Sequence, residues 1–287
     1  MKKFFIAIFS VISFCTTNAQ ELEKGLLWKV SGNGLEMPSY VFGTIHATCN
    51  ATLSPEVLKA LDNTTQLYLE IDMDSKTLTA DMMKGVAMKG GRKISEMVSA
   101  DEFKSLDAFL KDNIGLGMTI LDTYKPLIIE SLLLPKMLNC EIQSYELELV
   151  KHSQQQQEEI LGLETVQEQL TVFDNIPYEE QVKSLLKMSA DGLSGSTTQL
   201  KSLIVLYESQ DLNKLYAYMT NETDPVYFDH NDILLTNRNI NWIPKIEAVA
   251  KKQPTLFAVG AGHLAGEQGV IMLLRKKGYT VEPVVAK

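Results

Sequence analysis

Tyr40-Val41-Phe42-Gly43-Thr44-Ile45-His46 has the apolar run of a buried strand, which stops at a glycine and is followed three residues later by a histidine. The same pattern returns near the other end of the chain, as Leu256-Phe257-Ala258-Val259-Gly260-Ala261-Gly262-His263. With 17 glycines and 4 histidines among 287 residues, chance would place Gly-x-x-His only ~0.2 times in the chain. We therefore expect His46 and His263 to meet in one site.

The residue types in this repeated pattern favour a divalent metal ion. A glycine lets the chain turn sharply and lets a ligand approach the backbone. A neutral imidazole is the commonest protein ligand for metals and also carries protons near neutral pH. The alternative is two hydrogen-bonded loop histidines without a ligand. A single Gly-x-x-His would favour that alternative, whereas the repetition favours a shared site.

Acidic side chains follow two further predicted strands. Residues 66–72 are predicted as a strand that contains Glu70 and ends in an acidic cluster with Asp72 and Asp74. Residues 159–165 are predicted as a short strand that ends in Glu164 and Thr165. Such carboxylates either face solvent or serve as hard oxygen ligands and acid–base groups. Beside two strand-end histidines, Glu70 is the leading carboxylate. Arg238, flanked by two asparagines on a predicted helix, either stabilises an anion or forms a surface salt bridge.

The first 19 residues have the composition of a secretory signal peptide, with two lysines, an apolar stretch and Ala19 before the predicted cleavage point. The apolar stretch is too short to span a bilayer. Cys15 would allow a lipoprotein anchor, but the bulky Phe14 before it disfavours lipidation. The sequence predicts a secreted or periplasmic protein with no membrane span.

Charge and cysteine content narrow the partners and the compartment. The formal net charge is −9, and removal of the two signal-peptide lysines would make it −11. Such an acidic chain is not expected to bind nucleic acid or anionic membranes.

Cys49 and Cys140 remain in the mature chain. They either form a disulfide, which an exported protein permits, or stay as two buried thiols. Zinc binding is disfavoured because no Cys-x-x-Cys pair occurs.

The order of predicted elements indicates an α/β fold in one domain, residues 20–287, with a mixed central sheet and a large helical insertion at about 75–252. Residues 26–30 and 39–42 are predicted to form a hairpin. Residues 126–138 are predicted as one helix kinked by a proline, residues 192–196 as a flexible turn, and residues 233–252 as a helix interrupted by Pro244. A last helix is predicted over 267–277, which would place His263 just before a helix N-terminus.

The chain resembles the TraB/GumN family, whose relatives include the Tiki metalloproteases and, more distantly, erythromycin-esterase-like and ChaN-like proteins. The resemblance covers nearly all of the mature chain, in the family's order. Its matching pieces are Phe42-Gly43-Thr44-Ile45-His46, Leu69-Glu70-Ile71-Asp72, Gly162-Leu163-Glu164-Thr165 with Gln169, Asn237-Arg238-Asn239, and Val259-Gly260-Ala261-Gly262-His263 with Gly266-Glu267.

The resemblance implies an erythromycin-esterase/ChaN-like fold with the motifs gathered at one side of a sheet. It implies that His46, Glu70, Arg238 and His263 are catalytic or metal positions, and the Tiki branch implies a peptidase that depends on manganese or cobalt. The chain lacks a Tiki-type membrane anchor, which leaves the substrate open between peptides and small molecules. The oligomeric state is also open.

The leading hypothesis is a metal-dependent hydrolase in which His46, Glu70 and His263 hold the ion and leave a position for water. Glu164 is then expected as a fourth ligand or general base, and Arg238 as the group that holds an oxyanion or a substrate carboxylate. A second hypothesis is hydrolysis without metal, by a histidine base oriented by Glu70. A third is a protein that binds a peptide or another ligand without turnover, as the TraB resemblance suggests.

Overall fold

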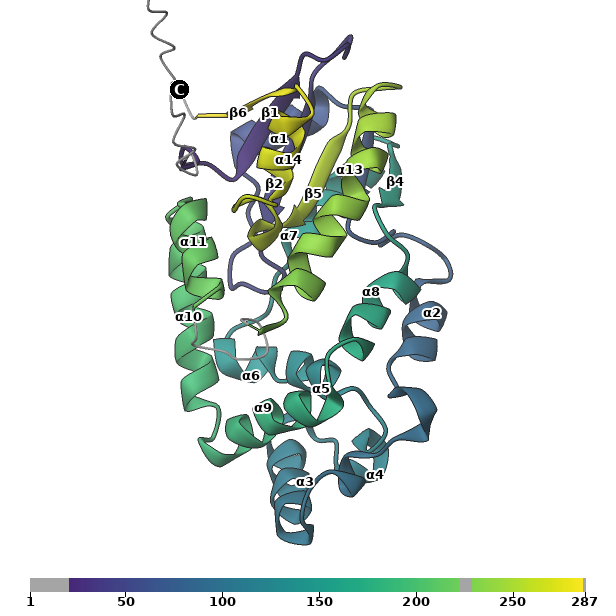
Figure 1. The fold of residues 1–287 in the computed structure, drawn as a ribbon, viewed down its shortest axis with the longest axis vertical. Helices are drawn as coiled ribbons and strands as arrows, with labels where there is room; N and C mark the ends of the chain where they lie inside the picture. Colours follow the sequence, from purple (N-terminus) through teal and green to yellow (C-terminus); the bar gives the residue numbers. More distant parts are fainter. Residues whose placement is uncertain (1–20, 222–228, 286–287) are drawn as a thin grey trace, which may run out of the picture.

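Six strands form one mixed sheet at one end of the molecule, and most helices lie beyond one edge of it (Figure 1). The computed structural model describes residues 21–221 and 229–285, so the predicted signal peptide lies outside the described residues. The strands are β1 (Leu27–Ser31), β2 (Ser39–Thr44), β3 (Gln66–Leu69), β4 (Glu159–Gly162), β5 (Leu256–Gly260) and β6 (Thr280–Pro283), in the spatial order β4-β3-β5-β2-β1-β6. This confirms the predicted α/β class.

The sheet register brings the ends of the site strands together. Strands β4, β3, β5 and β2 are mutually parallel, and β1 runs antiparallel to β2 and β6, as the predicted hairpin requires. Thr44 pairs with Gly260, and Leu69 pairs with Gly162. The four parallel strands therefore end at one edge of the sheet, where open α/β sheets place their ligand sites. All five residues of β5 are buried, which explains its continuous apolar sequence.

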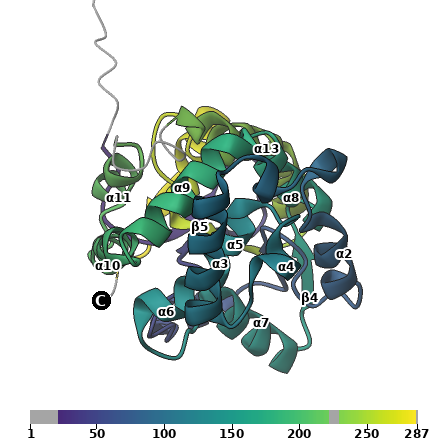
Figure 2. The same ribbon diagram turned by 90° about the horizontal axis from the view of Figure 1, so that it is seen from below.

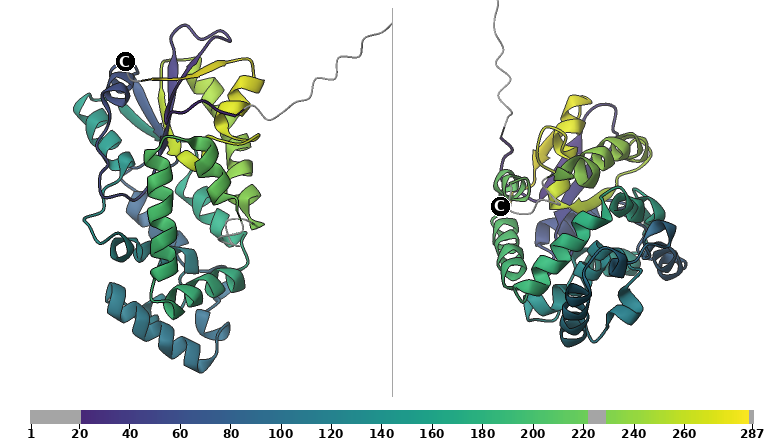
Figure 3. Two further views of the ribbon diagram at one scale, coloured as in Figure 1. Left: turned by 90° about the vertical axis from the view of Figure 1, so that its left-hand side faces the viewer. Right: turned by 60° about the horizontal axis from the view of Figure 1, so that its bottom comes forward.

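Helices cover both faces of the sheet and build a separate layer beyond its edge (Figures 1 and 2). Helices α1 and α7 lie on one face, and α13 and α14 on the other (Figure 3). No helix within the described residues has the length and apolar composition needed to cross a membrane. The helices are α1 (Pro55–Asp62), α2 (Leu78–Gly85), α3 (Ala100–Ile114), α4 (Met118–Leu121), α5 (Pro126–Leu132), α6 (Leu134–Leu138), α7 (Tyr145–Gln155), α8 (Val166–Asp174), α9 (Tyr178–Ala190), α10 (Ser194–Glu208), α11 (Leu212–Met219), α13 (Asn237–Ala250) and α14 (Val270–Lys276), with short turns η1 (Lys89–Gly91), η2 (Ile94–Glu96), η3 (Asp232–Thr236) and η4 (Ala261–His263).

Polar residues cap the starts of three helices. Ser54 accepts a hydrogen bond from the backbone at the start of α1. Ser99 and Thr165 each form a reciprocal capping box with a glutamate three residues later, at the starts of α3 and α8. Strand β4 ends at Gly162, and Thr165 caps α8 three residues later. Glu164 therefore lies in a short connection at the sheet edge.

The proline-containing helices differ from the predictions. The helix predicted over 126–138 is two helices, α5 and α6, and Pro135 lies in the first turn of α6. A proline is tolerated there because the first backbone N–H groups of a helix have no partner within it. By contrast, Pro244 lies inside α13 without ending it, so the predicted interruption is wrong.

Two predicted helix starts also need correction. Helix α10 already begins at Ser194, inside the segment predicted as a flexible turn. The last helix begins at Val270 rather than 267. His263 lies in the short turn η4, so it is not next to the N-terminus of that helix.

The predicted helix over 233–252 begins as a π-helical turn, η3, before α13. Such turns often occur at functional sites.

The helical layer has its own apolar core, separate from the core that surrounds the sheet. A buried ion pair joins two of its helices. Lys125 Nζ lies 3.0 Å from Asp174 Oδ1, with side chains 1 % and 3 % exposed. Lys125 also donates to the carbonyl of Leu170 at 2.9 Å. Burial alone would raise the pKa of Asp174, but its bonds to Tyr178 and Lys125 outweigh it and lower the pKa.

We expect Lys125→Met to lower the free energy of unfolding by about 3–5 kcal/mol, because it leaves a buried carboxylate without its partner. Lys89→Met is the matched control. Lys89 contacts the other oxygen of Asp174 with a side chain that is 61 % exposed, so its loss should cost only about 0–1 kcal/mol. Urea unfolding of the two variants at pH 7 measures the difference. Equal losses would contradict the prediction.

The same pair predicts the direction of acid sensitivity. The pKa of Asp174 is lower in the folded state than in the unfolded state. The ionised carboxylate therefore contributes its full share of the folding stability at any pH above its unfolded pKa of about 3.9. This stabilisation is lost as the pH falls through the pKa that Asp174 has in the folded protein. The gap between wild type and Lys125→Met should therefore narrow below about pH 4.

Candidate functional site

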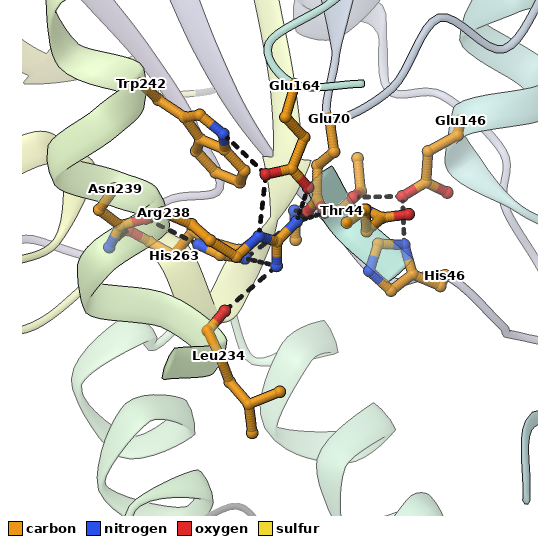
Figure 4. A network of polar contacts seen from close by, with 12 residues as sticks. Thr44, His46, Glu70, Glu146, Glu164, Leu234, Arg238, Asn239, Trp242 and His263 are labelled. Atoms are coloured by element: carbon orange, nitrogen blue, oxygen red, sulfur yellow. Dashed lines mark hydrogen bonds and ion pairs between the residues drawn. The ribbon is translucent and has the colours of Figure 1, made fainter. Parts of the chain in front are cut away.

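His46, Glu70 and His263 surround the backbone of Gly260 at the common edge of the parallel strands (Figure 4). A β-carbon placed on Gly260 would lie 3.3 Å from Glu70 Oε1, 3.4 Å from His46 Nε2 and 3.6 Å from His263 Cδ2. A β-carbon here would thus be in tight contact with Glu70 and in ordinary van der Waals contact with both histidines, so the three side chains lie close around this backbone position. The two Gly-x-x-His elements do meet.

Arg238 is the cation at the centre of the cluster. Its Nη2 donates to Glu70 Oε2 and to Glu164 Oε1, each at 2.6 Å. Its Nε donates to Glu164 Oε2 at 3.2 Å. Its Nη1 donates to the carbonyl of Leu234 at 3.1 Å and to His263 Nε2 at 3.0 Å. A guanidinium has five N–H groups, so this arrangement engages every donor. An oxyanion could reach Arg238 only if one of these bonds broke.

The two glutamates differ in their electrostatic surroundings. Burial alone would raise the pKa of Glu70, but Arg238 and the neighbouring histidines outweigh it and hold that pKa well below its usual range. The backbone N–H of Gly260 also donates to Glu70 Oε1, at 2.8 Å. Burial raises the pKa of Glu164, which shares the same guanidinium. Glu70 is thus the carboxylate held ionised.

The hydrogen bonds of Asn239 fix the tautomer of His263. Asn239 Nδ2 donates to the carbonyls of His263 and Gln268, at 3.2 and 2.8 Å. Its Oδ1 therefore faces the ring and accepts from His263 Nδ1–H at 2.7 Å. His263 Nε2 is left with a free electron pair, which accepts from Arg238. Burial lowers the pKa of His263 to about 3, so the ring is neutral at pH 7.

His46 is oriented by a carboxylate that the sequence analysis did not identify. Its Nδ1 lies 2.7 Å from Oε1 of Glu146, in the first turn of α7. Thr44 donates to the same oxygen at 2.6 Å, and Ser144 donates to the other at 2.6 Å. Burial alone would raise the pKa of Glu146, but the bond to His46 outweighs it and lowers that pKa to about 2. His46 is therefore oriented by Glu146 and not by Glu70.

Burial works against the charge on His46, but the hydrogen bond and charge of Glu146 outweigh it and raise its pKa above the ordinary value. The imidazole is enclosed on the Glu146 side and open to the pocket on the other, so 65 % of the side chain is exposed. Solvent on that side screens the ion pair.

A disulfide between Cys49 and Cys140 confirms one of the two alternatives for these cysteines. It joins the loop after His46 to the segment before α7. The same two segments exchange backbone hydrogen bonds between Thr48 and Gln143, at 3.1 and 2.8 Å. The disulfide and the bridge thus hold the histidine loop against the segment that leads to Glu146.

A pocket of about 620 Å³ opens from this cluster towards the helical layer. His46, Glu70, Arg238 and His263 all line it. Glu164 does not, because it lies behind Arg238, where Trp242 Nε1 also donates to it at 3.2 Å. The sequence predicted all five side chains as site residues, and the structure brings all five together. It places Glu164 in support of Arg238 rather than at the pocket wall.

The donor set fits a divalent metal in kind. Each imidazole is held through Nδ1, by Glu146 or by Asn239, as is usual for histidines that bind metals through Nε2. Among residues 21–221 and 229–285, however, no three His, Cys, Asp or Glu side chains are arranged as a ready ligand set. Arg238 explains this, since it holds both His263 Nε2 and Glu70 Oε2. A metal ion at His263 would compete with that contact.

We expect Glu146→Gln to lower the pKa of His46 by at least about one pH unit. A charge-assisted hydrogen bond contributes ~1.5–3 kcal/mol, and one pH unit corresponds to about 1.4 kcal/mol. Wild-type His46 should keep its proton to higher pH than the variant. An NMR titration of the imidazole signals, assigned with His46→Ala, measures both values. Glu148→Gln, on the same helix, is the control, and an unchanged pKa in Glu146→Gln would refute the pairing.

Replacing both cysteines, in Cys49→Ser/Cys140→Ser, should lower the free energy of unfolding by about 2–5 kcal/mol. The bridge closes a long loop, with a sequence separation of 91 residues, so its loss releases much chain entropy in the unfolded state. Urea unfolding measures the change, and reduction of the wild type should reproduce it. A change below about 0.5 kcal/mol would show that the bridge does not stabilise the fold.

Comparisons with known proteins agree with the motifs. The chain matches the family model described as TraB/PrgY/gumN family over residues 26–283. It is similar to "Metalloprotease TIKI1" of Danio rerio, 20 % identical over 325 residues, which cover 94 % of this chain and 65 % of that protein. "Metalloprotease TIKI2" of Danio rerio is 21 % identical over 320 residues, which cover 92 % and 62 %.

The chain thus spans slightly less than two thirds of the length of these two relatives. No solved structure matches it. The family match takes in both Gly-x-x-His elements, Glu70, Glu164 and Arg238, the residues that the fold gathers at one edge of the sheet. This protein belongs to the TraB/PrgY/gumN family.

Proposed function

We propose that this protein is an exported hydrolase that cleaves peptides with the help of a divalent metal ion held by His46, Glu70 and His263. The observation that carries the proposal is the meeting of the three side chains around Gly260. The two relatives named as metalloproteases support the reaction class. The disulfide supports export, because such bonds persist in oxidising compartments.

When bound, a divalent ion would lower the pKa of a coordinated water and polarise a substrate carbonyl. Manganese or cobalt is proposed from the family resemblance. The protein's own groups prepare the site for such an ion. Glu146 and Asn239 hold the two imidazoles by Nδ1, so each can present Nε2. Arg238 keeps Glu70 ionised and ready to act as an oxygen ligand.

The roles of Arg238 and Glu164 are narrower in this proposal than the sequence suggested. Every N–H group of Arg238 is engaged, so we assign it the placement of Glu70 rather than an oxyanion. Glu164 lies behind the guanidinium and outside the pocket wall, so we assign it charge balance for Arg238 rather than a proton-transfer role. With His46 engaged through both ring nitrogens, by the ion and by Glu146, proton transfer in this reaction is left to water.

Hydrolysis without metal is the second candidate, and one contact favours it. The bond between His46 and Glu146 has the form of a histidine base held by a carboxylate. In that reaction His46 would take a proton from water at Nε2, and Glu146 would stabilise the charged ring. The raised pKa of His46 predicts that the rate then increases with pH as the ring loses its proton.

Metal analysis tests the leading proposal. We expect the purified mature protein to bind about one Mn²⁺ or Co²⁺ per chain, and His46→Ala and His263→Ala to weaken binding by at least tenfold. His152→Ala is the control, because His152 lies on α7 at its far end from Glu146. Affinity should rise as the pH increases towards about 9, where His46 loses its proton, since a metal binds only neutral imidazole. Calorimetric titration gives the stoichiometry and the dissociation constants.

Two outcomes would decide against the leading proposal. Equal metal binding by wild type and both histidine variants would remove the site. Peptide cleavage that persists after complete chelation, yet is lost in His46→Ala, would select the metal-free reaction instead. A quenched fluorescent peptide library, assayed with and without chelator, provides this second measurement.

A further inference from the structure

Arg238 occupies one of the atoms that the proposed metal site needs. Asn239 holds His263 by Nδ1, so the ring presents the electron pair of Nε2 to a ligand. That electron pair already accepts a hydrogen bond from Arg238 Nη1 at 3.0 Å (Figure 4). An imidazole nitrogen has a single electron pair in the plane of its ring. It can therefore serve the guanidinium or a metal ion, but not both at once.

The contact of Arg238 with Glu70 leaves the other oxygen of that carboxylate for an ion. Arg238 Nη2 donates to Oε2 of Glu70 at 2.6 Å. The other oxygen, Oε1, lies 3.7 Å from His263 Nε2 and accepts from the backbone N–H of Gly260. Glu70 thus turns one oxygen to the arginine and the other to the histidine. Of the hydrogen bonds that Arg238 makes, only the one to His263 has to break for both side chains to act as ligands.

Glu164 holds the guanidinium from the side away from the pocket. It accepts from Arg238 Nη2 at 2.6 Å and from Nε at 3.2 Å, and its own side chain is 8 % exposed. The indole ring of Trp242 also lies against the guanidinium, with its centroid 4.8 Å from Arg238 Cζ. These contacts do not involve His263. Arg238 can therefore leave the histidine and remain paired, as a buried cation must.

The charge of Arg238 opposes a divalent ion as well. A guanidinium stays protonated in proteins, and charges interact more strongly where water is excluded. The side chain of Arg238 is only 13 % exposed. In the empty site it neutralises part of the negative charge with which Glu70 would attract an ion. The arginine thus competes with a metal both for an electron pair and for a carboxylate.

We infer that Arg238 is a built-in competitor of the metal ion, which occupies His263 while the site is empty and leaves it when the site fills. This inference concerns the regulation of the proposed site, and it rests on the proposed function for the identity of the ligands. Its consequence is that the arginine sets the metal concentration at which the protein becomes loaded. The same histidines and Glu70 would bind the ion more tightly without it.

The test compares metal affinity in variants that keep the net charge of the cluster. Arg238→Met combined with Glu164→Gln removes one positive and one negative charge, so the sum is the same as in wild type. Glu70 keeps two hydrogen-bond donors, the N–H of Gly260 at 2.8 Å and Nε2 of Gln169 at 3.1 Å. Calorimetric titration with Mn²⁺ at a fixed pH should show at least tenfold tighter binding by this double variant, because the histidine nitrogen is no longer occupied.

Two single variants complete the comparison. Glu164→Gln alone should weaken Mn²⁺ binding at least tenfold, because Arg238 then keeps its charge and loses the partner behind it. Lys245→Met should leave the affinity within twofold of wild type. Lys245 is a second cation on α13, but it donates to the carbonyls of Gly162 and Leu163 rather than to a proposed ligand. Thermal unfolding of each variant shows that it is folded.

A measurement on the metal-free wild type needs no change at Arg238. The nitrogen-15 chemical shift of His263 Nε2, assigned with His263→Ala, reports whether that atom accepts a hydrogen bond. We expect the shift of a neutral ring whose Nε2 is hydrogen-bonded. The shift of a free electron pair would show that the arginine does not occupy the histidine, and it would overturn the inference even if the double variant failed to fold.

The outcomes separate this inference from the proposed reaction. Binding by wild type that is tighter in the double variant, and lost when His263→Ala is added, supports both. Binding by the double variant alone, lost in the same way, supports the inference and removes the metal-dependent reaction of wild type. Equal or weaker binding by the double variant, with wild-type binding intact, keeps the proposed function and overturns the inference. Absence of binding in both proteins overturns both.

Discussion

A buried guanidinium between two carboxylates is the interaction on which the site depends. Arg238 contacts Glu70 and Glu164 at 2.6 Å each, and all three side chains are no more than 13 % exposed. Buried charges of this kind are stable only when each is paired and hydrogen-bonded. The pairing keeps Glu70 ionised, and the same guanidinium donates to neutral His263. The ionised state of Glu70 at the strand end therefore depends on this one arginine.

The fold explains why these groups can meet although the chain separates them widely. Parallel strands β2, β3, β4 and β5 end at one edge, and each delivers a polar residue just beyond its last pair. The π-helical turn η3 precedes α13, so Arg238 projects from the first turn of that helix towards the edge. The helical layer then closes the space in front of the cluster and makes a pocket of it. The strand ends provide most of the polar cluster, and the helices provide most of the apolar pocket wall.

The elements that the sequence predicted well are those with a local cause. Strong apolar runs predicted β2 and β5. The repeated Gly-x-x-His pattern identified the two histidines, and strand ends and family motifs identified their neighbours. These signals need only a few adjacent residues, so they can be read without knowing the fold.

The misses have a tertiary cause. Glu146 looks like an ordinary first-turn glutamate beside a capping serine, and nothing near it points to a histidine 100 residues away. The hydrogen bonds of Arg238 could not be predicted either, because its four partner residues come from separate segments. Likewise Pro244 stays within α13, whose apolar face packs against the sheet core and outweighs one missing hydrogen bond. Contacts between distant segments decided each of these cases.

A crystal grown with Mn²⁺ and measured for its anomalous scattering would test most directly whether the two histidines share one ion. We expect a single strong peak per chain about 2 Å from Nε2 of His46, Nε2 of His263 and an oxygen of Glu70, with Arg238 withdrawn from His263. A peak elsewhere, or none at saturating Mn²⁺ while Arg238 keeps its contact with His263, would contradict a shared metal centre.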